Sequence, residues 1–264
     1  MYLSELQLNH YRNYESVDVH FSPDTNVLIG ENAQGKTNLL EAIYVLALAR
    51  SHRTNTDREL IQWHEDFAKI TGLVQRSAGK TPLELVLSQK GKKAKVNHLE
   101  QAKLSQYIGQ LNVVLFAPED LNIVKGSPAV RRHFIDMEFG QMSSKYLYNI
   151  SQYKSILKQR NQYLKQLQRR QAKDLVYLGV LSDQLAAYGA EVTVARRQFL
   201  QQMEKWAQKL HQEITKDREV LTFKYQSQIP EEQLDQSVEE LYQQFQTLYE
   251  KQQTREVEQG TTLI

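Results

Sequence analysis

A phosphate-binding loop near the N-terminus constrains this chain more than any other feature of its sequence. Residues 30–37 read GENAQGKT and fit the pattern G-x-x-x-x-G-K-[ST] at every fixed position. Gly30 and Gly35 allow a tight bend and a close approach of the backbone to a phosphate. The N–H groups of such a loop form an anion site. Lys36 is suited to pair with the β- and γ-phosphates of a nucleotide, and the Thr37 hydroxyl is suited to ligate Mg²⁺.

The flanks of the loop agree with this interpretation. Residues 26–29 form a short apolar run, which predicts a buried strand. Beyond Lys36, apolar residues recur at helical spacing, which predicts a helix that begins near Gly35. Strand, loop and helix in this order are the context that the motif requires. We therefore predict a nucleotide site formed by Gly30, Glu31, Asn32, Ala33, Gln34, Gly35, Lys36, Thr37 and Asn38.

The rest of the N-terminal half reads mainly as strands. Alternating apolar residues around Leu6 and around Val19 have the period of two that is typical of strands with one buried face. Further strands are predicted over residues 70–74 and 83–87, joined by turn-forming residues 77–80, and residues 90–93 are predicted to form another turn before residues 95–97. A second short apolar run, residues 113–116, resembles a buried strand and is stopped by Pro118.

From residue 143 onward the pattern indicates long helices. Apolar stripes run from Ile150 to Leu167 and from Leu178 to Ile214, with a break near Lys173 and Asp174. Such stripes usually serve helix packing, so we expect an antiparallel hairpin or bundle. Residues 220–225 are a candidate strand, and residues 231–253 a further amphipathic helix. We predict two domains, residues 1–142 and residues 143–264.

The net charge of +2 conceals two oppositely charged segments. Residues 151–173 contain seven basic and no acidic residues, whereas residues 231–258 contain eight acidic and two basic ones. The basic segment is either a solvated helix face or a surface that contacts phosphates in a salt-dependent way. Its candidate DNA-binding residues are Lys154, Lys158, Arg160, Lys165, Arg169 and Arg170.

Composition excludes several other classes of protein. The chain has no cysteine, which removes disulfides, thiolate metal sites and cysteine nucleophiles. It lacks an apolar run of about 18 residues and a secretory signal, so we expect no membrane partner and a cytoplasmic location. The seven histidines show no metal-binding spacing, which leaves the nucleotide's Mg²⁺ as the expected metal.

Longer motifs carry a family resemblance. Residues 30–43, GENAQGKTNLLEAI, resemble the phosphate loop of the SMC/Rad50-like ABC ATPases, and residues 6–14, LQLNHYRNY, resemble their N-terminal turn. Residues 118–136, PEDLNIVKGSPAVRRHFID, resemble the signature of the RecF family of bacterial DNA replication and repair proteins. The resemblance implies an α/β fold with a P-loop ABC-type ATPase head (lobe I), a mixed β-sheet and a mostly helical lobe II. It also implies that Arg12 approaches the nucleotide.

The resemblance extends to function. It implies ATP-dependent DNA binding in recombinational repair, replication restart and the SOS response. It further implies gapped or single-strand/double-strand junction DNA as ligand, RecO and RecR as partners in RecA loading, an ATP-dependent homodimer with weak ATPase activity, and a nucleoid-associated location. Two other functions use the same loop: a small-molecule kinase, or a binding scaffold stabilised by its nucleotide.

Some features of the family are not found in the sequence. No apolar run after Thr37 ends in Asp-Asp or Asp-Glu, and no L-S-x-G-[QE] occurs. These Walker B and signature motifs are expected beyond Ile264, because the sequence ends where the family's G-P-H-R segment should begin. We thus expect a C-terminally truncated chain with an incomplete lobe II, no catalytic residue of its own and little hydrolysis alone.

The residues around the PED motif have more than one interpretation. Glu119 and Asp120 either sense Mg²⁺ and the attacking water or cap a helix N-terminus, as acidic residues often do there. Arg131 and Arg132 either contact phosphates or pair with Asp136 or Glu138. We keep Glu119 as a candidate metal residue.

Overall fold

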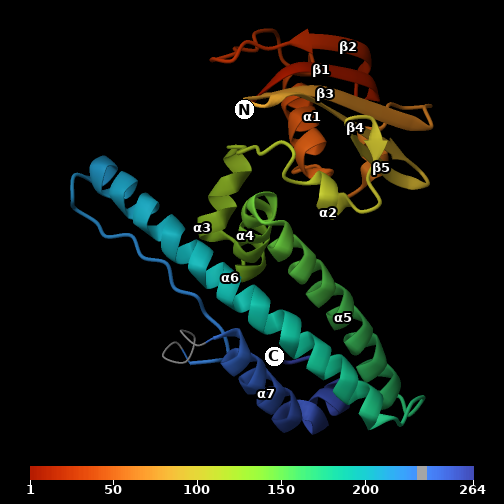
Figure 1. The fold of residues 1–264 in the computed structure, drawn as a ribbon, viewed down its shortest axis with the longest axis vertical. Helices are drawn as coiled ribbons and strands as arrows, with labels where there is room; N and C mark the ends of the chain where they lie inside the picture. The colour runs from red at the N-terminus through yellow and green to blue at the C-terminus, as the bar shows by residue number, and fades with distance from the viewer. Residues whose placement is uncertain (231–236) are drawn as a thin grey trace. The chain divides into compact units, whose positions relative to one another are not determined.

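The computed structural model describes residues 1–230 and 237–264 (Figure 1). It divides into two compact units, Met1–Ser144 and Lys145–Ile264, and each is described by itself. The first unit contains the phosphate-binding loop, and the second contains the basic segment. In the described part of the chain, no helix is both long and apolar enough to cross a lipid bilayer.

The first unit is built on a six-stranded sheet in the order β2-β1-β3-β4-β5-β6. The family resemblance implied a mixed sheet, whereas every pair of neighbouring strands among the described residues is antiparallel. Short turns join most consecutive strands, and such turns connect antiparallel strands. The strands are β1 (Tyr2–Tyr11), β2 (Tyr14–His20), β3 (Phe67–Arg76), β4 (Gly79–Ser88), β5 (Gly91–Val96) and β6 (Leu99–Glu100). β1 to β4 lie where strands were predicted. β5 begins at Gly91, within residues 90–93 that we predicted as a turn, and β6 was not predicted.

Helix α1 (Lys36–Leu48) covers one face of this sheet (Figure 1). The face is apolar because alternate strand residues point towards the helix: Leu8 of β1 lies opposite Ile70 of β3, which lies opposite Leu85 of β4. All three side chains are fully buried. The helix approaches closely at Gly72, where any Cβ would collide with Leu46. The sheet thus fixes the helix that follows the phosphate-binding loop.

Short helices complete the first unit. They are the 3₁₀ helices η1 (Asp57–Leu60) and η2 (Pro118–Leu121) and the α-helices α2 (Leu104–Tyr107), α3 (Asn122–Lys125) and α4 (Pro128–Met142). Tyr107 of α2 is fully buried, and its hydroxyl donates a hydrogen bond of 2.6 Å to the carbonyl of Leu46. This bond attaches α2 to the C-terminal end of α1.

Two predicted strands are not formed. Residues 26–29 and 113–116 belong to no strand, and neither pairs with another strand among the described residues. Some of their apolar side chains are therefore in solvent, with exposed fractions of 90% for Ile29 and 87% for Phe116, whereas Leu28 and Val113 pack partly buried against the core. An apolar run predicts that a segment can be buried, but only a neighbouring strand makes it part of a sheet. The prediction failed at that step.

The second unit consists of α5 (Ser144–Gln168), α6 (Leu175–Thr215) and α7 (Val238–Gln259). The predicted break at Lys173 and Asp174 is confirmed, because the Asp174 carboxylate caps α6 by accepting hydrogen bonds from the N–H groups of Val176 and Tyr177. The three helices share a core formed by Ile156, Leu181, Leu185, Ala186 and Tyr249.

Other helical predictions need correction. The apolar stripe of α6 is buried only in the first half of the helix. In the second half, Trp206 and Ile214 have exposed fractions of 72% and 80%. Residues 220–225 are not a strand. Helix α7 begins at Val238, where Ser237 and Glu240 form a capping box, and it extends beyond the predicted end at residue 253. Residues 231–236 of that predicted helix lie outside the described residues.

A buried ion pair crosses the second unit. Arg160 of α5 and Glu256 of α7 are both fully buried, and Nη2 of the arginine lies 2.6 Å from Oε2 of the glutamate. The guanidinium also donates to the hydroxyls of Ser182 on α6 and Thr262, and it lies over the ring of Tyr249 at 4.7 Å. One side chain therefore joins all three helices to the segment that follows α7.

We expect Arg160→Ala to lower the free energy of unfolding by about 3–5 kcal/mol, because it leaves the Glu256 carboxylate buried without its partner. Chemical denaturation measures this loss. Lys158→Ala, on the exposed side of the same helix, is the matched control and should change stability by less than about 0.5 kcal/mol. Equal effects of the two substitutions would contradict the assignment.

Candidate nucleotide-binding site

The phosphate-binding loop lies on the surface of the first unit, directly before α1. Residues 30–34 are exposed, and the helix begins at Lys36, as predicted. Gly35 has φ of 98°, a left-handed conformation that favours glycine, and it precedes the helix without a side-chain cap. The first N–H groups of a 13-residue helix are therefore left for another acceptor.

Lys36 bends back over the loop. Its Nζ donates hydrogen bonds of 2.7 Å to the carbonyl of Gly30 and 2.6 Å to that of Glu31. The ammonium thus lies within the concave side of the loop, close to the helix N-terminus, where the helix dipole favours negative charge. Together with the exposed hydroxyl of Thr37, these groups fit the triphosphate and Mg²⁺ that the motif predicts.

The turn between β1 and β2 packs against the loop. A Cβ built on Gly35 would lie 2.7 Å from the hydroxyl oxygen of Tyr14 and 2.9 Å from Nδ2 of Asn13. These are closer than real Cβ contacts, so a larger residue would displace the two side chains, and the positive φ of Gly35 also favours glycine. The N-terminal turn that resembles the SMC/Rad50-like group thus contacts the phosphate-binding loop directly.

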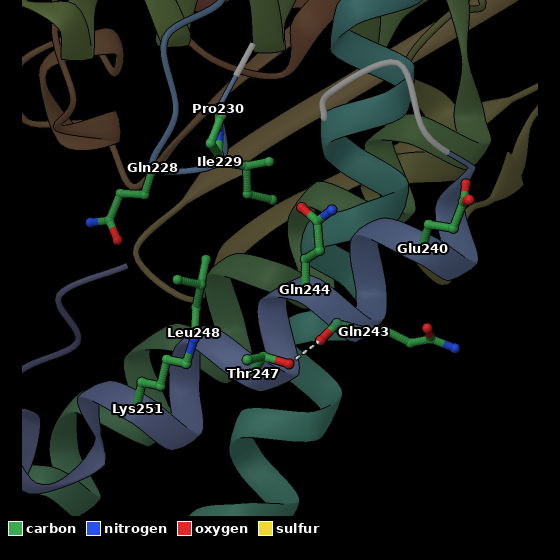
Figure 2. Close-up of a pocket in the computed structure, with 9 residues that line it drawn as sticks. All are labelled: Gln228, Ile229, Pro230, Glu240, Gln243, Gln244, Thr247, Leu248 and Lys251. Atoms are coloured by element: carbon green, nitrogen blue, oxygen red, sulfur yellow. Dashed lines mark hydrogen bonds between the residues drawn. The ribbon is translucent and has the colours of Figure 1, made fainter. Parts of the chain in front are cut away.

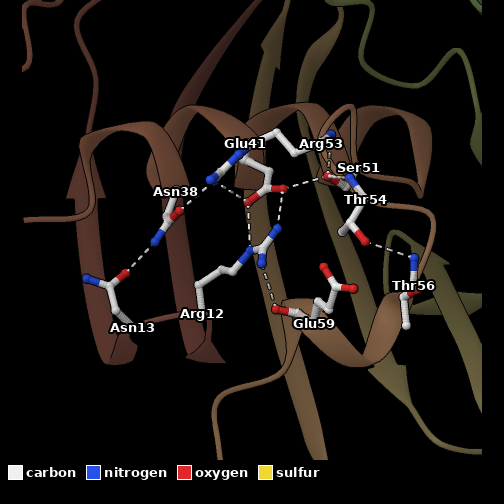
Figure 3. Close-up of polar contacts among 9 residues, drawn as sticks. All are labelled: Arg12, Asn13, Asn38, Glu41, Ser51, Arg53, Thr54, Thr56 and Glu59. Carbon is white, nitrogen blue, oxygen red and sulfur yellow. Dashed lines mark hydrogen bonds and ion pairs between the residues drawn. The ribbon is translucent and has the colours of Figure 1, made fainter. Parts of the chain in front are cut away.

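Beneath the loop, the side chain of Glu41 on α1 is fully buried (Figure 3). Arg12 donates to both of its oxygens, from Nη2 at 2.7 Å and from Nε at 2.9 Å. The hydroxyl of Ser51 donates at 2.5 Å, and Nη1 of Arg53 lies 3.4 Å away. Arg12 also donates to the carbonyl of Glu59. The carboxylate therefore joins the β1–β2 turn, α1 and the segment after α1.

Charge and hydrogen bonding decide the ionisation of Glu41. Burial alone would raise the pKa of its carboxyl group. The hydrogen bonds from Arg12 and Ser51, together with the positive charges of Arg12 and Arg53, outweigh burial and hold this pKa below its ordinary value. The group is therefore an anion at neutral pH.

The network continues to the first turn of α1. Nη1 of Arg53 donates a 2.9 Å hydrogen bond to Oδ1 of Asn38, whose Nδ2 donates at 2.8 Å to Oδ1 of Asn13 (Figure 3). Asn38 follows Thr37 directly, so this chain of contacts ends beside the predicted Mg²⁺ ligand. Sequence reasoning missed Ser51 and Arg53, because single polar residues in a loop give no periodic or motif signal.

Of the two acidic residues after Pro118, the structure describes the side chain of Asp120. The side chain of Glu119 lies outside the described part of the chain. Asp120 accepts a 2.7 Å hydrogen bond from the N–H of Ala117, which is a local turn contact. Asp120 also lines a cavity of about 510 Å³ with Glu138, and burial, reinforced by the charge of Asp120, raises the pKa of Glu138. This cavity is bordered by residues 50–55.

The two arginines of α4 differ. Arg131 donates from Nη1 to the carbonyls of Ile123 and Gly126, at 3.2 and 3.0 Å, and so holds the end of α3. This contact favours a structural role over a phosphate contact for Arg131. Arg132 is exposed.

The basic candidates of α5 do not share one environment. Lys154, Lys158 and Lys165 are exposed and line a shallow groove with Leu157, Asn161 and Gln162. Arg169 and Arg170 are also exposed. The prediction of DNA binding by Arg160 is wrong, because its guanidinium is buried against Glu256. Helical spacing placed Arg160 on the opposite face from the lysines, which charge counting does not detect.

A second hollow, of about 380 Å³, lies in the second unit between residues 228–230 and α7 (Figure 2). Amide side chains such as Gln228 and Gln243 form much of its lining, with Glu240 and Lys251 as the charged members. In the described residues, no group of three or more carboxylates or histidines is arranged to hold a metal ion there or elsewhere. The first unit thus contains the stronger candidate site.

Comparison with known proteins agrees with this geometry. Residues 1–262 match a family model described as AAA ATPase domain, so the chain belongs to that class of domain. It is 62% identical over 263 residues to the DNA replication and repair protein RecF of Limosilactobacillus reuteri, and 62% identical over 264 residues to that of Pediococcus pentosaceus. Each alignment covers 100% of this chain and 70% of the relative. The chain belongs to the RecF family of DNA replication and repair proteins.

Solved structures lead to the same family. A structure of the recombination mediator protein RecF with ATPrS, in the RecFOR pathway, matches 100% of this chain and 70% of its own with a TM-score of 0.93 and 27% identity. A second, of RecF with ATP, matches 99% and 70% with a TM-score of 0.89 and 28% identity. The predicted fold, an ATPase head followed by a helical lobe, is confirmed.

We expect Glu41→Gln to lower the free energy of unfolding at pH 7 by about 1–3 kcal/mol, because the arginines lose a charged acceptor. A carboxylate with a lowered pKa stabilises the fold above its unfolded pKa of about 4.3, and this contribution is lost as the pH falls through the folded pKa. Between about pH 5 and 3, the wild type should therefore lose more stability than Glu41→Gln. Glu15→Gln, at an exposed position of β2, is the control, and a parallel pH dependence of Glu41→Gln and wild type would contradict the prediction.

Proposed function

We propose that this protein binds ATP with Mg²⁺ at residues 30–38 and uses the bound nucleotide to control its association with DNA in recombinational repair and replication restart. The observation that carries the proposal is the loop itself: Gly35 in a left-handed conformation, a helix N-terminus behind it, and the Lys36 ammonium held on its concave side. Lys36 would bind the phosphates, and Thr37 would ligate Mg²⁺. A matching solved structure of the same family is described as RecF with ATP, which supports the proposal.

The DNA ligand we propose is gapped DNA or a single-strand/double-strand junction. Membership of the family supports a repair role, and the matching structures belong to the RecFOR pathway. On that basis RecO and RecR are the proposed partners, RecA loading is the proposed outcome, and an SOS-related role follows from it. Since the DNA is chromosomal, the proposed location is the cytoplasm, in association with the nucleoid.

We further propose weak ATP hydrolysis within an ATP-dependent homodimer. The residues that would orient the attacking water stay a prediction, because these 264 residues contain no apolar run ending in Asp-Asp or Asp-Glu after the loop. The expected activity of this chain alone is therefore nucleotide binding with little hydrolysis. The Mg²⁺-sensing role of Glu119 also stays a prediction.

The proposed DNA contact in the second unit is the lysine face of α5. Lys154, Lys158 and Lys165 are exposed on one side of a long helix, with Asn161 between them. Flexible lysine side chains act as point charges toward phosphates and give affinity without sequence preference. Arg169 and Arg170 extend the positive charge at the C-terminal end of the helix.

Lys36→Ala should weaken ATP binding about 10–100-fold, because one charge-assisted interaction of about 1.5–3 kcal/mol is lost. Titration with a fluorescent ATP analogue measures this. Lys93→Ala, an exposed lysine of β5, is the matched control and should bind as the wild type does. In cells, full repair activity of Lys36→Ala would favour a nucleotide-independent scaffold and contradict the ATP-dependent function.

Replacing Lys154, Lys158 and Lys165 together by alanine should weaken DNA binding and reduce the salt dependence of its affinity. The slope of log affinity against log salt should decrease by about 2–3, which is about 0.7–0.9 per phosphate contact. The control replaces Lys205, Lys209 and Lys224, which are also exposed in the second unit, and keeps the net charge equal. If both triple variants had the same slope, general charge rather than the α5 face would explain binding.

A further inference from the structure

We propose that Trp63 is the centre of a docking site for a partner protein, and that the site receives a lysine or arginine side chain of that partner. Trp63 belongs to the first unit and lies between η1 and β3. This surface is separate from the phosphate-binding loop and from the lysine face of α5. Only the identity of the partner rests on the proposed function.

The indole of Trp63 is a large apolar group in contact with solvent. Its side chain is 85% exposed, and within residues 1–230 and 237–264 it has no hydrogen bond and no ring contact. Phe67, at the start of β3, is 43% exposed and places its ring edge-on to His10 at 5.7 Å. Tryptophan is among the residues that most often dominate the energy of a protein interface. The exposed indole is therefore a suitable anchor for a partner.

The backbone holds this indole in a fixed position. Gln62 donates from its N–H to the carbonyl of His10 at 2.8 Å, and its own carbonyl accepts from the N–H of Glu65 at 3.2 Å, which closes a tight turn. Arg58 also donates to the carbonyl of Glu65. His64 has φ of 72°, a left-handed conformation that is uncommon for a residue other than glycine. A side chain on such a constrained turn loses little conformational freedom when it binds.

The surroundings of the indole are acidic. Residues 59–68 contain three carboxylates and neither a lysine nor an arginine. The carboxylate of Asp66 is exposed and forms no ion pair in the described part of the chain. Glu65 lies 3.7 Å from Nδ1 of His10. These acidic groups lie within a few residues of Trp63 on the same turn.

The nearest basic residues along the chain do not neutralise the turn. Arg58 reaches the turn through its contact with the carbonyl of Glu65, so its charge offsets one of the three carboxylates. Lys69 is paired with Glu84 of β4 at 3.1 Å. The turn therefore keeps a net negative charge beside an exposed aromatic ring.

A partner that matches this surface combines a flat apolar contact with a positive charge. A guanidinium or ammonium group over the face of an indole gains a cation–π attraction, and neighbouring carboxylates add charge-assisted hydrogen bonds. Nucleic acid is disfavoured here, because carboxylates repel its phosphates. The surface thus fits a lysine or arginine side chain of a protein rather than DNA.

The first test uses the fact that the chain has two tryptophans. Trp206→Phe leaves Trp63 as the only indole fluorophore, and its fluorescence is titrated with tetra-arginine. We expect a saturable change that weakens at high salt, and no change with tetra-glutamate. The matched variant Trp63→Phe, which keeps the 72% exposed Trp206 as reporter, should show no saturable change. The absence of a saturable change at Trp63 would overturn the proposal.

The second test measures binding of the full chain to purified RecR and RecO, the partners proposed above. Trp63→Ala should weaken binding to one of them by about 30-fold or more, the effect typical of an interface hot spot. Trp63→Phe should bind more tightly than Trp63→Leu, because phenylalanine keeps an aromatic face. Asp66→Lys should also weaken binding, whereas Asp24→Lys, at an exposed position elsewhere in the first unit, should not. The unfolding temperature of every variant should match that of wild type.

Three results of the second test would overturn the proposal. Trp63→Ala could bind both proteins as tightly as wild type does. It could lose affinity for DNA instead, which would make the indole a platform for base stacking. It could change only the self-association of the chain in sedimentation, which would make this surface an interface between two copies. If wild type bound neither RecR nor RecO while Trp63 still responded to tetra-arginine, the proposed partners would be wrong and the docking chemistry would be supported.

Discussion

The buried carboxylate of Glu41 determines how the parts of the first unit meet at the phosphate-binding loop. It is the common acceptor for Arg12 of the β1–β2 turn and for Ser51 of the segment after α1. A buried anion is stable only when its hydrogen bonds are satisfied, so those two segments have little freedom to move away from α1. The turn and the loop are then brought together at Gly35, where a Cβ would lie 2.7 Å from the Tyr14 hydroxyl oxygen and the positive φ favours glycine.

The second unit uses the same physical device for a different purpose. Arg160 and Glu256 are buried as a pair, and their hydrogen bonds reach Ser182 and Thr262. Here the charged groups hold helices to one another, whereas in the first unit they hold a ligand-binding loop. In each unit an arginine pairs with a buried glutamate, so its charge stabilises the fold rather than contacting a ligand.

Local patterns predicted most of the elements, for identifiable reasons. The period of two around Leu6 and Leu8 is a direct consequence of one buried strand face, so β1 followed from the sequence. The break before α6 could be placed because Asp174 is a strong N-cap. Residues 26–29 and 113–116 were predicted wrongly, since pairing depends on a neighbour that no local pattern specifies. The second half of the apolar stripe of α6 was also expected to be packed but is exposed, because burial too depends on a neighbouring element that the local pattern does not specify.

The sequence by itself determined the loop, the helix behind it and the family, because eight contiguous residues and a long PED-to-Asp136 motif carry their chemistry locally. Only the tertiary structure decided which positively charged side chains are exposed enough to contact a ligand. In the sequence, Arg12 and Arg160 look as able to bind a phosphate as Arg53 or Lys158. In the folded chain, Arg12 and Arg160 form ion pairs with buried glutamates. Burial and pairing depend on residues far apart in the sequence, such as Arg160 and Thr262, which are 102 positions apart, and such contacts exist only once the chain has folded.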